Sequence, residues 1–224
     1  MNVPLGDRSY GVVIGEGAVA ELAAVLPASA KRVAVVTQPG IPLEVSLPDH
    51  AVETYVIGDG ESAKSLSTIE TLVRGFARQG LTRRDVVVGV GGGMVTDVAG
   101  FAAACWHRGT PVVHVSTTLL GMVDAAIGGK TGINTAEGKN LVGSFHTPAG
   151  VVCDLDVLST LPQADLVAGL AEVLKGGFIA DPRILELVEA APQDAVRWDA
   201  PVLDELVRRK VAVKAEVVAG DLRE

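Results

Sequence analysis

Short runs of apolar, often β-branched residues alternate along the first part of this chain with longer stretches of helical periodicity. The runs that predict strands are RVAVVT (32–37), ETYVIG (53–58), DVVVGVG (85–91), PVVHVS (111–116) and GVVCDL (150–155). The helices expected between them are 19–26, 65–80 and 96–106. Near-continuous apolar strands are typical of a parallel sheet that is buried on both faces. The alternation therefore predicts an α/β fold built on a parallel sheet.

The pattern changes after residue 162. Helical periodicity alone follows, over 164–177, 181–191 and 201–220. We therefore expect two units: a parallel-sheet α/β domain over residues 1–160, and the start of an all-helical domain over 161–224. The helical unit is short for an independent domain, so truncation of a longer chain is an expectation at this stage.

Composition narrows the classes of function. The chain has 224 residues, 48% of them hydrophobic but only 4% aromatic, and a formal net charge of −8. This acidic balance argues against nucleic acid as a partner. There is neither an apolar run of about 18 residues nor a leader pattern, so no membrane partner and a cytoplasmic location are expected. Cys105 and Cys153 are too few for a metal or disulfide framework and are interpreted as two buried, reduced thiols.

The segment VVVGVGGGMVTDVAG (86–100) joins a strand to a helix through three consecutive glycines, Gly91–Gly93. Glycines allow close approach of a ligand, and a helix N-terminus offers free N–H groups to a pyrophosphate. The dinucleotide fingerprint is incomplete, because its third glycine falls on Met94. A tight strand–helix turn is the alternative. Asp97, one turn into the helix, is suited to hold a ribose hydroxyl or simply to complement the helix dipole.

Two further polar segments follow expected strands. The first, GDGESAKS (58–65), forms either a ligand loop at the carboxyl end of a parallel strand or an ordinary solvated loop. The second, residues 115–145, sets Asp124, Lys130, Lys139 and Asn140 among many glycines and indicates an anion pocket. Its GGKTG core is not a P-loop, since Asp124 stands where that motif needs its first glycine.

Glu172 and Lys175 lie three residues apart and share one face of an expected helix. They form either a surface ion pair or, given the apolar and glycine-rich flanks, part of a less solvated site where Glu172 could ligate a metal. None of the four histidines has metal-ligand spacing. His114, within a strand pattern, is interpreted as a hydrogen-bonded core histidine.

Taken together, the motifs resemble those of the 3-dehydroquinate synthase family of the shikimate pathway. The segments that carry the resemblance are 59–64, 91–104, 108–134, 138–148 and 169–179. The GGG-x₃-D pattern alone is shared with glycerol and iron-dependent alcohol dehydrogenases. GGKTGIN and GKN-x-VG-x-F point to the synthase over those relatives, and over cyclases that make valiolone or deoxyinosose.

The resemblance implies conversion of 3-deoxy-D-arabino-heptulosonate 7-phosphate to 3-dehydroquinate and phosphate, with catalytic NAD and one divalent metal, zinc or cobalt. In this scheme the metal polarises the C5 hydroxyl and NAD removes a hydride from that carbon. Phosphate then leaves, NADH returns the hydride, and ring opening with an intramolecular aldol closure follows.

The resemblance also assigns roles residue by residue. The implied NAD contacts are Asp59, Gly60, Glu61, Ser62, Ala63, Lys64, Gly92, Gly93, Met94, Val95, Thr96, Asp97, Thr117, Thr118, Lys130, Lys139, Val157, Leu158, Ser159 and Thr160. The implied substrate contacts are Asp124, Lys130, Asn140, Lys175 and Lys214. Arg108 matches an arginine that family members lend across a homodimer interface, and Glu172 matches a metal ligand.

The chain departs from the family pattern in three places. Gln38 replaces the aspartate that binds the adenosine ribose, and residues 41–52 are too few for the usual helix. The family's two metal-binding histidines would follow residue 224. We therefore expect this chain alone to bind NAD weakly, without tight zinc or turnover. The alternatives are an NAD-dependent polyol dehydrogenase of the same superfamily and a noncatalytic NAD-binding fragment.

Overall fold

A computed structural model describes residues 1–221 of the chain, and within them a seven-stranded sheet has the order β1-β2-β9-β6-β5-β3-β4. Its strands are β1 (Asn2–Val3), β2 (Tyr10–Gly15), β3 (Arg32–Thr37), β4 (Ala51–Val56), β5 (Val86–Gly91), β6 (Val112–Ser116) and β9 (Gly150–Asp154). Every neighbouring pair is parallel except β1 with β2. The prediction of an α/β fold on a mainly parallel sheet is confirmed.

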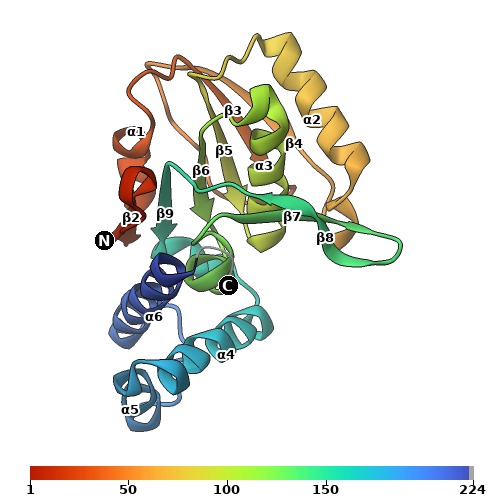
Figure 1. Cartoon of the computed structure of the whole chain (residues 1–224). Coiled ribbons are helices and arrows are strands. Elements are labelled where there is room, and N and C mark those ends of the chain that lie inside the picture. Colours follow the sequence, from red (N-terminus) through yellow and green to blue (C-terminus); the bar gives the residue numbers. More distant parts are fainter. Residues whose placement is uncertain (222–224) are drawn as a thin grey trace.

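Helices cover both faces of this sheet (Figure 1). On one face lie α2 (Leu66–Gln79) and α3 (Gly93–Cys105), which enclose Phe76 and Val98 in a common core with strand residues. On the other lie the short helices η2 (Ala18–Glu21) and α1 (Leu22–Val25), together with part of the 39–50 loop. No helix forms over 41–50, in agreement with the shortness noted in the sequence.

The order of the strands creates a crevice between β3 and β5. The chain passes from β3 outward to β4 and then returns through α2 to β5, on the other side of β3. In open α/β sheets, ligands bind at the carboxyl ends of strands where the order reverses in this way. The glycine junction after β5 therefore lies at the position where this fold class binds its ligands.

The remaining helices pack beneath the carboxyl ends of the strands (Figure 1). They are η5 (Gly121–Ala125), η6 (Leu155–Thr160), α4 (Gln163–Ile179), α5 (Pro182–Ala190) and α6 (Pro201–Gly220), while the single turns η1 (Gly6–Arg8), η3 (Glu61–Ala63) and η4 (Trp106–Arg108) lie in the loops around the sheet. Val173 of α4 and Leu206 of α6 share one core with Val12 of β2 and Val151 of β9. The helical part is thus joined to the sheet by a continuous core, and the division at residue 160 stays a prediction.

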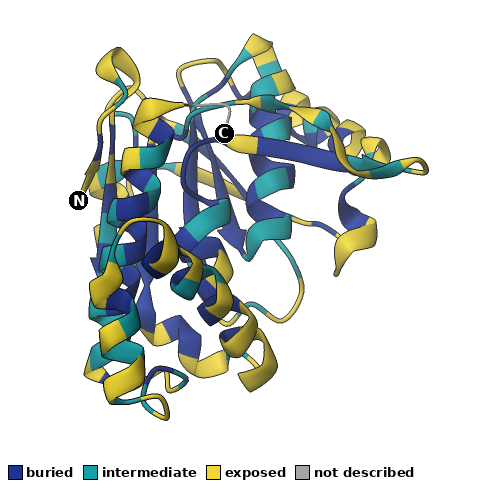
Figure 2. Cartoon of the chain, turned by 60° about the horizontal axis from the view of Figure 1, so that its bottom comes forward, coloured by how far each residue is buried: buried dark blue, intermediate teal, exposed yellow. Residues whose placement is uncertain are grey.

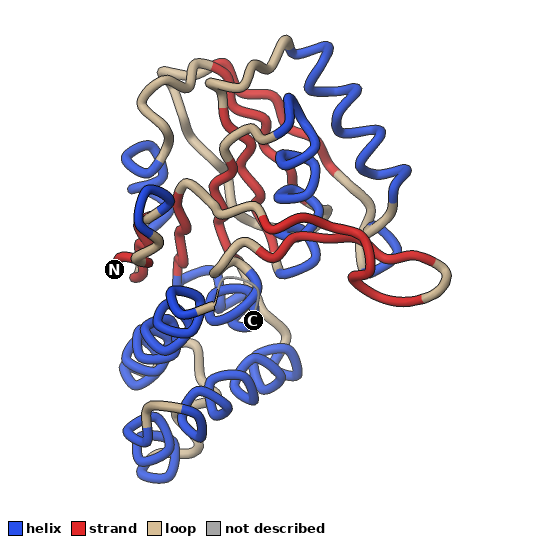
Figure 3. Tube along the Cα trace, viewed as in Figure 1, coloured by secondary structure: helices blue, strands red, loops and turns tan. Residues whose placement is uncertain are grey.

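The sequence did not predict a hairpin of two antiparallel strands, β7 (Lys130–Thr135) and β8 (Gly138–Phe145), which projects from the body of the molecule (Figure 3). Gly128 and Gly129 precede it with φ values of 103° and 91°, which L-residues rarely adopt. Ile133 and Val142 anchor it on the core beneath α3. Glycine-rich composition concealed this strand pattern, because glycine and lysine both disfavour strands.

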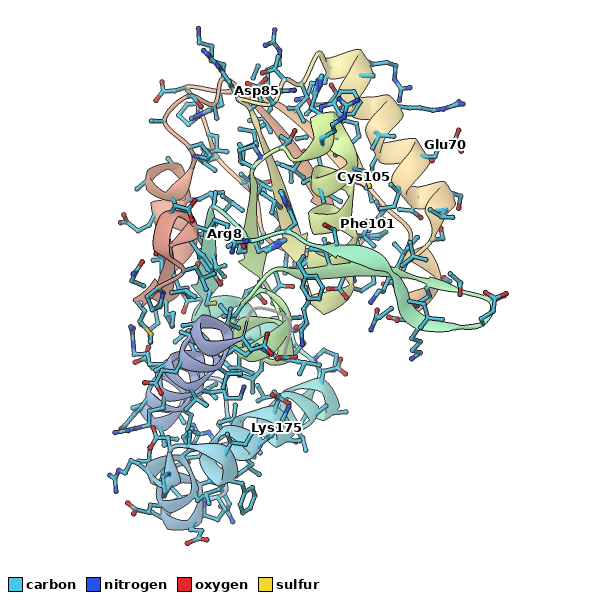
Figure 4. All side chains as sticks on the ribbon, viewed as in Figure 1. Arg8, Glu70, Asp85, Phe101, Cys105 and Lys175 are labelled. Atoms are coloured by element: carbon cyan, nitrogen blue, oxygen red, sulfur yellow. The ribbon has the colours of Figure 1, made fainter. Side chains whose placement is uncertain are left out.

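Two expectations about burial are wrong, and one about hydrogen bonding is not met. The predicted strand 53–58 was expected to be buried, but β4 is an edge strand whose residues are mostly exposed (Figure 2). Cys105 is exposed on the last turn of α3 (Figure 4), whereas Cys153 is buried in β9. His114 is a core residue at 2% exposure, but its Nδ1 has no hydrogen-bond partner among the described residues.

Candidate functional site

A cavity of about 500 Å³ lies at the carboxyl ends of β3, β4, β5, β6 and β9, and we call it the cofactor cavity. Its lining residues are Gln38, Pro39, Gly40, Ile41, Pro42, Asp59, Gly60, Glu61, Gly92, Gly93, Met94, Thr117, Thr118, Val157, Thr160, Leu161, Pro162 and Asp165. The volume is in the range typical of small-molecule sites. Segments widely separated in the sequence thus converge on one cavity, and many were predicted from the resemblance to contact NAD.

The glycine junction opens α3 directly onto this cavity. Gly92 is the N-cap and makes no side-chain cap, so the first-turn N–H groups of α3 have no intrahelical acceptor. The glycines also have a packing role. A Cβ at Gly91 would lie 2.5 Å from Val95 Cγ2, and one at Gly92 would lie 2.8 Å from Thr118 Cγ2. The tight turn is therefore present at this segment, and the binding of an anion at the uncapped end of α3 stays a prediction.

The rim of the cofactor cavity is built by short polar contacts. The Gln38 side-chain amide donates to Asp59 Oδ1 at 3.1 Å, and the backbone N–H of Gly60 donates to the same oxygen at 2.8 Å. Gln38, at the position where the family has an aspartate, therefore lines the cavity and holds Asp59 in place.

Part of the predicted NAD set lies beside the cavity and not in its lining. Lys64 is 4% exposed, and its Nζ lies 2.6 Å from Asp97 Oδ2 and also contacts Asn140 Oδ1. Asn134 strengthens the link by donating to Glu61 Oε1 and accepting from the Asn140 N–H, each at 2.8 Å. This network fastens the 59–64 loop to the β7–β8 hairpin.

Burial raises the pKa of Asp97 to about 6, although the hydrogen bond and the charge of Lys64 lower it. Because desolvation outweighs the ion pair, this carboxyl can gain or lose a proton near neutral pH. Asp97 also lines a second cavity of about 480 Å³ that we call the hairpin cavity. Its other lining residues are Lys130, Thr131, Gly132, Asn140, Leu141, Gly143, Ser144 and Phe145.

A cluster of opposite charges lies where η5, α4 and α6 meet. Lys214 Nζ is 2.9 Å from Asp124 Oδ1, and Lys175 Nζ is 3.3 Å from Glu172 Oε1. The four residues that the resemblance implies for the substrate pocket or the metal thus form two ion pairs. Lys175 extends from α4 and is 61% exposed (Figure 4).

Sequence reasoning missed a fifth member of this cluster, Lys210. It is 3% exposed, and its Nζ lies 3.1 Å from Glu172 Oε1 and donates to the Val123 carbonyl at 3.2 Å. The sequence did contain a signal for it. Lys210 lies four residues before Lys214, with the apolar residues VAV (211–213) between them, and this spacing puts both lysines on one face of α6.

The other predicted residues are scattered. Val95, Thr96 and Leu158 are buried, Ala63 is 6% exposed, and Ser62, Ser159 and Lys139 are exposed. Arg108 is exposed and follows His107 in η4 (Trp106–Arg108); the φ value of Arg108 is 65° and that of His107 is 49°.

Within residues 1–221 no group of three or more histidine, cysteine, aspartate or glutamate side chains could hold a metal ion. No helix in the described range is long and apolar enough to cross a membrane.

Two family models together match residues 54–224 of the chain. The model described as 3-dehydroquinate synthase N-terminal matches residues 54–168, more than half of the chain, and the C-terminal model matches residues 169–224.

Curated proteins named 3-dehydroquinate synthase are similar along nearly the full chain. The one from Thermobifida fusca is 55% identical over 223 residues, covering 96% of this chain and 60% of its own length. The one from Streptomyces coelicolor is 51% identical over 226 residues, covering 98% and 62%. The chain thus spans about three fifths of the length of the curated relatives it matches.

Solved structures of related cyclases share the fold. A 2-deoxy-scyllo-inosose synthase complexed with carbaglucose-6-phosphate, NAD⁺ and Co²⁺ superposes with a TM-score of 0.87 at 27% identity, covering 98% of this chain and 63% of that one. A 2-epi-5-epi-valiolone synthase from Streptomyces hygroscopicus with NAD⁺ and Zn²⁺ bound gives 0.85 at 33% identity, covering 96% and 62%. A probable glycerol dehydrogenase from Sinorhizobium meliloti, at 21% identity and a TM-score of 0.67, shares the fold alone.

Proposed function

Because this chain belongs to the 3-dehydroquinate synthase family, we propose that it forms the NAD-binding and part of the substrate-binding region of a phosphate-eliminating lyase. The substrate is 3-deoxy-D-arabino-heptulosonate 7-phosphate, and the products are 3-dehydroquinate and phosphate. The observation that carries the proposal is the convergence of the 59–61, 92–94 and 117–118 segments on one cavity beside the open N-terminus of α3.

NAD fits the chemistry of the cofactor cavity. Its pyrophosphate would lie against the first-turn N–H groups of Gly93 and Met94, where the dipole of α3 favours negative charge. Asp59 and Glu61 offer carboxylates to ribose hydroxyl groups. When bound, NAD takes a hydride from the substrate and returns it in a later step.

The cations near η5 suit an anionic sugar phosphate. Lys175 and Lys214, with Lys130 on the hairpin, would hold the phosphate and the carboxylate, and Asp124 would orient the hydroxyl groups. Such residues act mainly by positioning and by electrostatic stabilisation of developing charge. Asp97, with its pKa raised to about 6, can exchange a proton beside the hairpin cavity at neutral pH.

The described residues do not fit the divalent metal that the resemblance implies. Glu172 is the one residue matched to a metal ligand, and two ammonium groups already lie within 3.3 Å of its Oε1. A catalytic zinc needs about three protein ligands. Residues 1–221 therefore offer no complete metal site, and we expect the 224-residue chain to bind NAD without stoichiometric zinc or sustained turnover.

The runner-up is an NAD-dependent polyol dehydrogenase, because the GGG-x₃-D segment at the start of α3 is also typical of glycerol dehydrogenases. A product assay on a protein that carries the whole family length separates the two. A synthase releases phosphate from the heptulosonate phosphate without net NADH, whereas a dehydrogenase accumulates NADH from a polyol. Accumulation of NADH without release of phosphate would rule out the synthase.

The NAD assignment can be tested on this chain by substitution at Met94, a partly buried residue at the second position of α3 that lines the cofactor cavity. Met94→Glu puts a carboxylate where the pyrophosphate would lie, while an acidic side chain in the first turn of a helix does not destabilise it. We expect NAD affinity, measured by calorimetry, to fall by about tenfold or more through charge repulsion.

Met94→Gln is the matched control, because it has the size of glutamate without the charge. It should bind NAD within about threefold of the wild type. Equal affinity in the two variants would mean that the pyrophosphate is not at the N-terminus of α3.

A further inference from the structure

The function proposed above gives the buried ammonium group of Lys210 no contact with NAD or with the substrate. Lysine is rarely buried without a charged partner, and here the partner is Glu172, with Nζ and Oε1 3.1 Å apart. The Lys210 side chain is 4% exposed and that of Glu172 is 16% exposed. A third contact, to the Val123 carbonyl at 3.2 Å, fixes the ammonium between α4, α6 and η5.

The packing around the lysine stem is specific to this placement. A Cβ at Gly176 would lie 2.5 Å from Lys210 Cδ, so the absence of a side chain at this position of α4 leaves room for the stem to pass. Lys210 therefore reaches Glu172 through a gap that the sequence of the neighbouring helix provides.

Glu172 Oε1 is shared by two ammonium groups that differ in exposure. Lys175 Nζ is 3.3 Å away on a side chain that is 61% exposed, whereas Lys210 is almost fully enclosed. Solvent and salt screen the outer pair, and the inner pair is screened much less. Although the distances are similar, Lys210 dominates the electrostatic potential at this carboxylate.

We propose that Lys210 is an internal counter-ion that competes with divalent cations for the Glu172 carboxylate. The metal part of this inference rests on the family assignment of Glu172 as a metal ligand. A divalent cation that approaches Oε1 meets a fixed positive charge about 3 Å from that oxygen, and the two like charges repel across a poorly solvated site. Lys210 thus weakens cation binding at Glu172, and its ion pair with that carboxylate joins α4 to α6.

The test measures Co²⁺ binding to this chain without NAD or substrate. Paramagnetic broadening of backbone amide signals over residues 169–176, followed by NMR as Co²⁺ is added, gives a dissociation constant even for a weak site. In Lys210→Met the stem is kept and the charge is lost, and we expect affinity at Glu172 to rise by about tenfold or more. Lys175→Met is the matched control on the same oxygen, and its affinity should change by less than about threefold, since its charge is screened.

Lys210→Gln is the second variant in case Lys210→Met fails to fold, because its amide can still donate to the Val123 carbonyl. Unchanged or weaker Co²⁺ binding in the neutral Lys210 variants, or an equal rise in Lys175→Met, would overturn the proposal.

Glu172→Gln separates this inference from the assignment beneath it. If it abolishes broadening in each background, the carboxylate is the ligand, and the effect of Lys210 is judged on its own. If broadening persists without the carboxylate, or none of the variants binds Co²⁺, both the metal role of Glu172 and the competition by Lys210 are rejected. The NAD assignment is not affected, since the Met94 variants test it separately.

Discussion

His114 lies in β6 between Gly89 and Gly100, in a position without a partner for its Nδ1 among residues 1–221. Burial, together with a smaller effect of the nearby His146, lowers the pKa of His114 to about 3. An unfolded histidine titrates near 6.5. Between these values the unfolded chain binds a proton that the folded chain excludes, so stability should fall as pH falls below about 6.5.

We expect His114→Leu to remove this dependence. Between pH 6.5 and pH 5 the wild type should lose about 2 kcal/mol of unfolding free energy that the variant keeps, at up to about 1.4 kcal/mol per pH unit. Asp97, whose raised pKa has the opposite effect, is present in both proteins and cancels in the comparison. Urea unfolding at several pH values measures the difference. If the unfolding free energies of the two proteins changed in parallel with pH, burial would not keep His114 in its neutral form.

At the scale of elements, α4 approaches η5 closely through Gly169. A Cβ at this position would lie 2.7 Å from Leu119 Cβ and 2.9 Å from the backbone nitrogen of Leu120. Neither neighbour can move without shifting the segment between β6 and η5, and η5 carries Asp124. The spacing between the helical part and the strand ends therefore depends on one glycine.

Gly169→Ala should destabilise the chain. Alanine improves helix propensity by about 1 kcal/mol, but overpacking of a close contact typically costs about 1–3 kcal/mol, and the clash with backbone puts the cost toward the upper end. We expect a net loss of about 1–2 kcal/mol in urea unfolding. Gly220→Ala is the control, since a Cβ there meets nothing within 4 Å; a loss of the same size in both variants would refute the packing argument.

At the scale of the whole molecule, Arg108 is presented to solvent by a strained backbone. His107 and Arg108 both have positive φ, a conformation that is uncommon for residues other than glycine. Strain of this kind is often kept at functional positions. The strain is consistent with the expectation, drawn from the family resemblance, that Arg108 reaches across a homodimer interface.

We expect the purified chain, with a mass of 23.0 kDa, to sediment as a species of about twice that mass, because a two-fold dimer is the commonest assembly. Arg108→Ala should leave that species intact if the side chain serves the partner's site and not the interface energy. Sedimentation velocity over a range of concentrations decides the point, and a monomer at every concentration would contradict the dimer for this chain.

The sequence by itself determined the parallel sheet, the turn into α3 and the loops that meet at the cofactor cavity. These features follow from local patterns: apolar runs of strand length, helical spacing, and glycines at the end of a strand. Because parallel strands bring their carboxyl ends to one edge of a sheet, local patterns indicated where loops could meet, whereas the family resemblance selected the loops predicted to contact NAD.

Only the tertiary structure decided the exposure of β4, the place of the β7–β8 hairpin and the role of Lys210. β4 is exposed because it lies at the edge of the sheet. The residues of a strand do not by themselves determine whether it takes an edge or a central position. The residues next to Lys210 in the sequence do not indicate that it is buried, because its partners Glu172 and Val123 belong to other elements. The physical reason is that burial and charge pairing depend on contacts between segments far apart in the chain, whereas periodicity depends on neighbours.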